Sequence, residues 1–190
     1  MSGGAGTGKT VAALHRMKFL SENKSAGEKI LFTTYTKALT ENLRKLAADL
    51  EVDSKGLTIS NIDALAFDLV KDFSLIKHDY KVFGLHSIKD PKEILSTELS
   101  PFDQDFLFQE YEQVILYHDV KNIEEYLKTP RIGRGRAISR TQRKDIWNLV
   151  QKYNNTKAKY HFYHKEELYN LLVNFLEAHE TKAFDYVLVD

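Results

Sequence analysis

Hydrophobic and polar residues in the first third of the chain alternate between a helical period and short apolar runs. Val11, Leu14 and Met17 recur at helical spacing and predict a first helix. The polar segment Ser21–Gly27 predicts the loop that ends it. Lys29–Tyr35 is a short apolar run rich in β-forming residues, which predicts a buried parallel strand.

The alternation continues for one more round. A helical stripe predicts a helix over Thr36–Leu50, and Gly56–Ser60 predicts a second short strand. Ser60 or Asn61 then caps a third helix. The two helices carry these apolar stripes: Leu39, Leu43, Leu46, Ala47 and Leu50 in the earlier one, and Ile62, Leu65, Ala66, Leu69, Val70 and Phe73 in the later one.

Over residues 74–179 the strand signals stop, and helices with aromatic stripes replace them. Ser100 and Pro101 predict the start of one helix, Asn122–Leu127 predicts another, and Ser139 caps a third. Lys165–His179 predicts a fourth. The stripes are most simply the core of a helical insertion. An aromatic box for a ligand is the less favoured interpretation.

A final apolar strand, Phe184–Asp190, closes the chain. Strands that alternate with helices predict an α/β fold, with a parallel sheet and flanking helices. We assign residues 1–73 and 180–190 to this sheet and residues 74–179 to the mainly helical insertion.

Composition narrows the functional classes. The 190 residues carry a formal net charge of zero, so attraction to nucleic acid requires local basic patches. The chain has no cysteine, which excludes disulfides and thiolate metal sites and favours a reducing compartment. A signal peptide and a membrane-spanning apolar run are not evident in the sequence, so we expect a cytoplasmic protein without a membrane partner.

Candidate chemistry begins at Gly3–Thr10, which matches the phosphate-loop pattern G-x-x-x-x-G-K-[ST]. Its glycines allow positive φ, so backbone N–H groups can converge on an anion where a helix begins. Lys9 is expected to reach the β- and γ-phosphates, and the Thr10 hydroxyl to bind Mg²⁺. A glycine-rich disordered terminus is the weaker alternative. The predicted ATP-binding residues are Gly3, Gly4, Ala5, Gly6, Thr7, Gly8, Lys9 and Thr10.

Phe184–Asp190 fits the second nucleotide motif, a buried strand that ends in a carboxylate. Asp190 is expected to hold Mg²⁺ through water and to act with Lys9 in catalysis. The pattern is weak alone and strong beside Gly3–Thr10, and together they predict a P-loop NTPase core of the RecA-like type. Only Met1 and Ser2 precede the loop, so we expect a fragment that lacks the strand normally found before it.

With both motifs in place, the chain resembles the N-terminal motor half of UvrD/Rep-like superfamily 1 helicases. Ile30–Leu39 resembles the family's motif Ia, which makes Tyr35, Thr36 and Lys37 candidate contacts to single-stranded DNA. The stretch that resembles motif Ib has Asp63 where the family usually has His, and a carboxylate repels phosphate.

The resemblance implies an ATP-driven DNA helicase or translocase, in a family that usually moves 3′ to 5′. It also implies that residues 74–179 correspond to the family's inserted subdomain 1B. The family needs a Glu after Asp190 and arginines from a second motor domain, and neither is in this sequence. The chain alone is therefore expected to be an incomplete motor.

Lys128–Lys144 is the largest one-signed stretch, with basic residues and no acid. A solvated loop is one interpretation. Phosphate contact is favoured, because the family's 1B region faces DNA and a basic loop can follow a backbone. The candidate contacts are Arg131, Arg134 and Arg136.

Other functions stay open at this point. His161 and His164 form a close histidine pair, but a third metal ligand is not evident beside them. An ATP-responsive nucleic-acid regulator without unwinding activity and a small-molecule kinase share the phosphate loop. A kinase needs neither the Ile30–Leu39 motif nor the basic stretch, so both features weigh against it.

Overall fold

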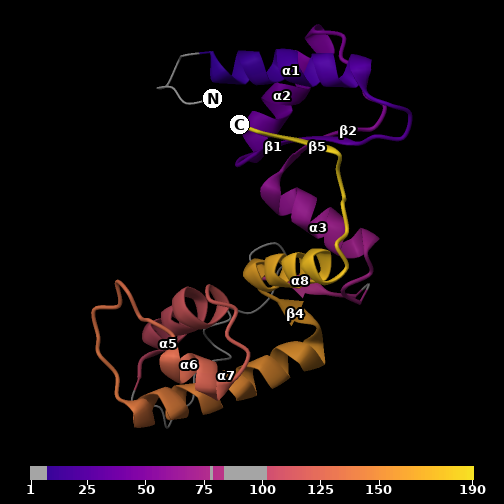
Figure 1. Cartoon of the computed structure of the whole chain (residues 1–190). Coiled ribbons are helices and arrows are strands. Elements are labelled where there is room, and N and C mark those ends of the chain that lie inside the picture. Colours follow the sequence, from indigo (N-terminus) through magenta and orange to yellow (C-terminus); the bar gives the residue numbers. More distant parts are fainter. Residues whose placement is uncertain (1–7, 78, 84–101) are drawn as a thin grey trace. The chain divides into compact units, whose positions relative to one another are not determined.

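The computed structural model describes residues 8–77, 79–83 and 102–190. The chain divides into two compact units, one made of Met1–Asp72 and Val173–Asp190 and the other of Phe73–Leu172. The first unit is built around a small sheet, and helices dominate the second (Figure 1).

Three parallel strands form the sheet of the first unit, in the order β2-β1-β5. All residues of β1 are buried, as expected for a parallel strand covered on both faces. The register sets Phe32 beside Ile59 and Leu188, so these three side chains share one face. The strands are β1 (Ile30–Thr34), β2 (Leu57–Asn61) and β5 (Tyr186–Val189).

Helices α1 (Lys9–Asn23) and α2 (Lys37–Asp49) cover that face of the sheet (Figure 1). Leu14, Met17 and Leu43 are buried with Phe32 in one cluster. Helix α3 (Ile62–Asp72) follows β2 directly, and the Asn61 side chain accepts a hydrogen bond from Ala64 N–H at 3.0 Å. The predicted parallel sheet with flanking helices is confirmed.

Two details of the first helix differ from prediction. Helix α1 continues to Asn23, so the loop expected from Ser21 begins only at Lys24. Val11 recurs at helical spacing with Leu14 and Met17, but it is not buried with them and 57% of it is exposed. It lies in the first turn of α1, outside the cluster that Leu14 and Met17 join.

The second unit has a core rich in aromatic rings. Tyr111, Tyr126 and Tyr153 are fully buried together with Ile146 and Val150. This confirms that the aromatic stripes form a core. Helix α8 (Lys165–Ala178) has residues in both units. The other elements are β3 (Lys81–Val82), α5 (Gln104–Glu110), the π-helical turn η1 (Tyr111–Leu116), α6 (Ile123–Lys128), α7 (Arg140–Tyr160) and β4 (Phe162–Tyr163).

Helix starts in this unit follow their capping residues. Ser139 caps α7, as predicted, and forms a capping box with Gln142. Asn122, expected inside its helix, is instead the cap of α6. The start expected at Ser100 and Pro101 lies outside the described residues. Helix α5 begins later, at an Asp103 cap whose carboxylate accepts from Phe106 N–H at 2.7 Å.

The second unit also contains a two-stranded parallel sheet, β3-β4, that the sequence did not predict. Each strand has only two residues, which is too short for periodicity to reveal. None of the described helices is long and apolar enough to cross a membrane.

Candidate functional site

The carboxyl ends of the parallel strands in the first unit meet at one edge of the sheet. Tyr35, Thr36 and Lys37 directly follow β1, and Asp190 directly follows β5. Asp190 N–H donates to the Thr33 carbonyl at 3.1 Å, which ties the end of β5 to the end of β1. In open α/β sheets this edge is where ligands bind.

Helix α1 begins beside this edge. Its N-cap, Gly8, has φ 76° and ψ 17°, a left-handed conformation that favours glycine. The Gly8 carbonyl accepts from Ala12 N–H at 2.9 Å, so the helix is regular from its start. Its first turn contains no acid, which leaves the positive end of the helix dipole available to an anion. The predicted ligands Gly3, Gly4, Ala5, Gly6 and Thr7 lie outside the described residues.

Thr10 and Asp190 meet although 180 positions separate them. The Thr10 hydroxyl is 3.0 Å from Asp190 Oδ1 and 2.9 Å from Oδ2. A cavity of about 350 Å³ opens beside the pair. Its lining residues are Lys9, Ala13, Arg16, Val187, Leu188, Val189 and Asp190. The structure thus brings Lys9, Thr10 and Asp190 to one place.

Arg16 is a lining residue that sequence reasoning missed. The signal was present, because Lys9, Ala13 and Arg16 are spaced by four and three residues and therefore share one helix face. A second cation on the face that carries Lys9 increases the positive charge along this cavity.

The residues at this edge suit a magnesium ion by their chemistry. A hydroxyl oxygen and a carboxylate oxygen are hard donors, and Mg²⁺ is usually held by one or two such groups, waters and substrate phosphates. Among the described residues no cluster of three His, Asp or Glu side chains could hold a metal by itself. A site made of Thr10 and Asp190 therefore suits a metal that arrives with a phosphate ligand.

The motif Ia residues occupy the turn from β1 into α2. Tyr35 is 84% exposed, which is unusual for a tyrosine and leaves its ring face open. The Thr36 hydroxyl caps α2 by accepting from Leu39 N–H at 3.2 Å, so its side chain already has a structural role. Lys37 is exposed at the first position of α2.

Asp63, the acid in the stretch that resembles motif Ib, lies in the first turn of α3. A carboxylate there interacts favourably with the positive end of the helix dipole. The position therefore has a local structural explanation for its acid.

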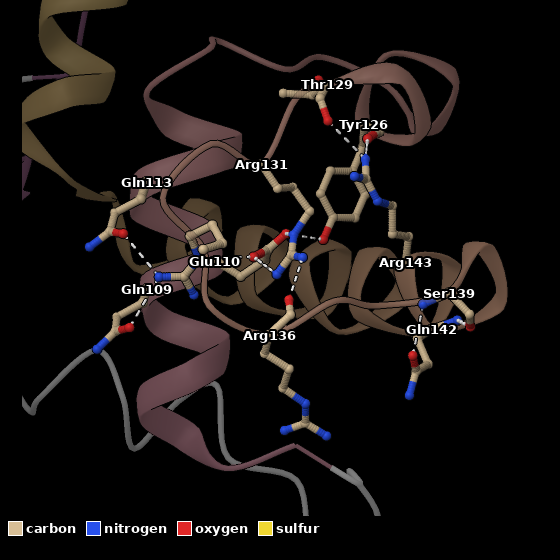
Figure 2. A network of polar contacts seen from close by, with 11 residues as sticks. Gln109, Glu110, Gln113, Tyr126, Thr129, Arg131, Arg136, Ser139, Gln142 and Arg143 are labelled. Atoms are coloured by element: carbon tan, nitrogen blue, oxygen red, sulfur yellow. Dashed lines mark hydrogen bonds and ion pairs between the residues drawn. The ribbon is translucent and has the colours of Figure 1, made fainter.

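The basic stretch of the second unit is organised around a buried carboxylate (Figure 2). The Glu110 side chain has no exposed surface and pairs with Arg131 at 2.7 Å and with Arg134 at 3.4 Å. Tyr126 also donates to Glu110 at 2.8 Å. Arg134 further donates to Gln109 and Gln113, at 3.1 and 2.9 Å. We call this group the Glu110 cluster.

Electrostatics within the cluster favour the ionised acid. Burial alone raises the pKa of Glu110, but hydrogen bonds from Arg131 and Tyr126 and the charges of Arg131 and Arg134 together hold that pKa below its usual value. Burial, with Glu110 nearby, raises the pKa of the Tyr126 hydroxyl, which stays protonated as a donor.

These contacts correct one expectation. Arg131 and Arg134 were expected as exposed loop charges, but their side chains are only 8% and 9% exposed. Arg136 is exposed, and Figure 2 shows its side chain directed away from Glu110. Its guanidinium lies 5.0 Å from the ring centroids of both Phe102 and Phe106. Of the three candidate arginines, Arg136 alone keeps its charge on the surface.

A second buried polar group lies between α7, η1 and α8. Lys157 donates to Tyr111 Oη at 2.7 Å and also to Glu167. Tyr153 Oη and His164 Nε2 are 2.6 Å apart. Burial, followed by the charge of Lys157, lowers the pKa of His164 to about 3, so this histidine is neutral at physiological pH.

The two histidines considered for a metal have different partners. His161 Nδ1 lies 2.7 Å from Asp79 Oδ2, whereas His164 faces Tyr153 inside the core. Both side chains are therefore engaged by other groups of the protein.

The sequence of the chain matches a known protein family. The family model of the UvrD/REP helicase N-terminal domain matches residues 1–190. No curated protein matches the chain significantly. The match along the whole chain shows that it belongs to the UvrD/REP helicase family.

Proposed function

From this family membership, we propose that the chain binds ATP with Mg²⁺ where α1 begins and β5 ends, as part of a motor that moves on single-stranded DNA. The family supports a helicase-type function in general. The observation that carries the finer proposal is the contact between Thr10 and Asp190, at 2.9 and 3.0 Å. It joins the predicted metal ligands of two motifs from opposite ends of the chain.

Each residue at this edge has a separate task. Lys9 supplies positive charge to the β- and γ-phosphates, and the amides at the start of α1 bind phosphate oxygens. Thr10 and Asp190 would hold the metal through their hydroxyl and carboxylate oxygens. When bound, Mg²⁺ neutralises charge on the β- and γ-phosphates.

The DNA contacts proposed for motif Ia are Tyr35, Thr36 and Lys37. An open tyrosine ring can stack on a base, and an exposed lysine can pair with a phosphate. The hydrogen bond from Asp190 N–H to the Thr33 carbonyl connects the metal-binding strand end to the strand that leads into Tyr35. A shift of either strand end is therefore transmitted to the other, which provides a physical link between nucleotide and DNA.

Isothermal titration of the chain with ATP and Mg²⁺ tests the nucleotide site. Replacing Lys9 with Ala removes the cation expected to contact the phosphates, and we expect binding to weaken by roughly 2–5 kcal/mol. Lys45→Ala is the matched control, because Lys45 is exposed on α2. Equal affinities for the wild type and Lys9→Ala contradict the proposed site.

A further inference from the structure

The turn between α7 and β4 presents lysines and aromatic rings together. Helix α7 ends at Tyr160, and His161 then adopts the left-handed conformation with φ 54°. Strand β3 fixes the next residues, because Lys81 N–H donates to the His161 carbonyl at 2.9 Å. Phe83 N–H likewise donates to the Tyr163 carbonyl at 3.0 Å. These two hydrogen bonds connect the turn to β3.

Two rings at this turn are stacked. The centroids of Tyr160 and Phe162 are 5.9 Å apart, with 28° between their planes. Phe162 is in turn supported edge-on by Phe83, at 5.4 Å. Tyr160 is the outermost ring and is 53% exposed. Tyr160 is therefore a half-exposed ring that rests on Phe162, and Phe162 in turn packs against Phe83.

Lysines flank these rings. Lys159 Nζ lies 5.3 Å from the Tyr160 centroid, and Lys81 Nζ lies 5.5 Å from the Phe162 centroid. The sequence from Ile146 to Lys165 contains no acid. Asp79, the neighbouring acid on the β3 side, lies 2.7 Å from His161 Nδ1. Lys81 and Lys159 supply the positive charge beside the two rings.

We propose that the surface formed by Lys81, Lys159, Tyr160 and Phe162 binds single-stranded nucleic acid; we call it the Tyr160 surface. An exposed, supported ring beside ammonium groups is what a base and its phosphate require together, because stacking accepts any base and lysines neutralise the backbone. A peptide would need a larger apolar patch or acids of its own. This inference rests on the proposed function and adds a contact that the helicase motifs do not include.

Fluorescence anisotropy with a labelled oligothymidylate, in the absence of nucleotide, tests the proposal. Tyr160→Ala removes the stacking ring, and we expect affinity to fall by at least about fivefold. Tyr160→Phe keeps the ring and should bind as the wild type does. Tyr117→Ala is the matched control, because Tyr117 is 76% exposed in the same unit and lies outside the Tyr160 surface.

The lysines have a separate signature. Replacing Lys81 and Lys159 together with Ala should reduce the slope of log K against log salt by about 1.4, from about 0.7 per phosphate contact. Tyr160→Ala should leave that slope unchanged. A photocrosslink from a 5-iodouracil oligonucleotide to Tyr160 or Phe162 in the wild type supports the surface independently of any variant.

The outcomes separate this inference from the proposed function. If the wild type binds the oligonucleotide and Tyr160→Ala loses no more affinity than Tyr117→Ala, the Tyr160 surface is wrong and the DNA-motor proposal survives. If the wild type binds no oligonucleotide, both the surface and the DNA part of the proposed function fail. ATP binding measured by titration is unaffected by either result.

Discussion

The two units use charged side chains in opposite ways. At the sheet edge of the first unit, the carboxylate of Asp190 is exposed and accepts a hydrogen bond from the Thr10 hydroxyl. In the second unit, Glu110 has no exposed surface and is enclosed by two guanidinium groups and a tyrosine hydroxyl. The first carboxylate can accept a ligand, whereas the second already has its partners.

The difference shows that a run of charge in a sequence does not identify a binding surface. The stretch Lys128–Lys144 is the most basic in the chain, yet part of its charge stabilises the fold of the second unit. Burying an ion requires a partner for it, and Arg131 and Arg134 supply that partner. Where a charge lies relative to the core decides its role.

The largest effect is expected from breaking the Glu110 cluster. Glu110→Ala leaves Arg131 and Arg134 buried without their acid, and we expect the free energy of unfolding to fall by about 3–5 kcal/mol. Chemical denaturation measures this. Asp145→Ala, at an exposed position of α7, is the control and should change stability by less than about 0.5 kcal/mol. A small effect of Glu110→Ala would make the cluster equivalent to a surface ion pair.

Acid should destabilise the second unit next most strongly, through His164. Its pKa is lowered from 6.5 to about 3 in the fold, so the unfolded chain takes up the proton first as pH falls. The contribution of neutral His164 to the free energy of unfolding is therefore fully present above about pH 6.5 and is lost as the pH falls toward 3. At about 1.4 kcal/mol per pH unit, the loss by pH 4 is about 3 kcal/mol.

His164→Gln removes this titration and should flatten the pH dependence of stability between pH 6.5 and 4. His118→Gln, at an exposed position, should keep the wild-type slope. Identical pH profiles for the wild type and His164→Gln would mean that the neutral, buried histidine contributes nothing to acid sensitivity.

A change at the exposed carboxylate of Asp190 should alter the binding of ATP with Mg²⁺ but not the free energy of unfolding. Asp190→Asn weakens a charged oxygen donor, and we expect the Mg²⁺-dependent part of ATP affinity to fall by about tenfold. Stability should stay within about 0.5 kcal/mol, because the Thr10–Asp190 contact is exposed. Titrations with Mg²⁺ and with EDTA measure the difference. Asp68→Asn on α3 is the control, and equal Mg²⁺ dependence in both variants would remove Asp190 from the metal site.

Much of the first unit could be predicted from the sequence, because its signals are local. Lys29–Tyr35 gave β1, and the apolar run before Asp190 gave β5, each to within two residues. That Thr10 and Asp190 lie close together was expected, because the two motifs to which they belong were predicted to hold the same Mg²⁺. The assignments of ATP, metal and DNA contacts to these residues remain predictions.

In the second unit the aromatic core could be predicted, but the burial of Arg131 and Arg134 could not, for a physical reason. A sequence displays the charge of Arg131 but not its partner, and Glu110 lies on another element. One signal was available. Glu110 falls four residues after Phe106 and three after Leu107, so it sits on the apolar stripe of its helix. An acid on a buried stripe requires a cation, and a basic stretch that contains no acid can supply it.

The smallest expected effect concerns the arginine that stays on the surface. If Arg131, Arg134 and Arg136 all contacted phosphates, replacing them together would reduce the salt slope of DNA binding by about 2. Because Arg131 and Arg134 pair with Glu110, we expect the triple change to reduce the slope only by the contribution of Arg136, which is about 0.7. Arg136→Gln should therefore lower the slope by that amount in an anisotropy salt series. The loss of its contacts with Phe102 and Phe106 should lower stability by less than about 1 kcal/mol.

Arg134→Gln should have the opposite effects on stability and on the salt slope of DNA binding. It removes a charge from the same loop, but that charge is 9% exposed and bound to Glu110, Gln109 and Gln113. We expect reduced stability with an unchanged salt slope, because a guanidinium held by an internal acid releases no counterions from DNA. If Arg134→Gln lowers the slope as much as Arg136→Gln does, the Glu110 cluster opens when DNA binds, and its arginines belong to the binding surface after all.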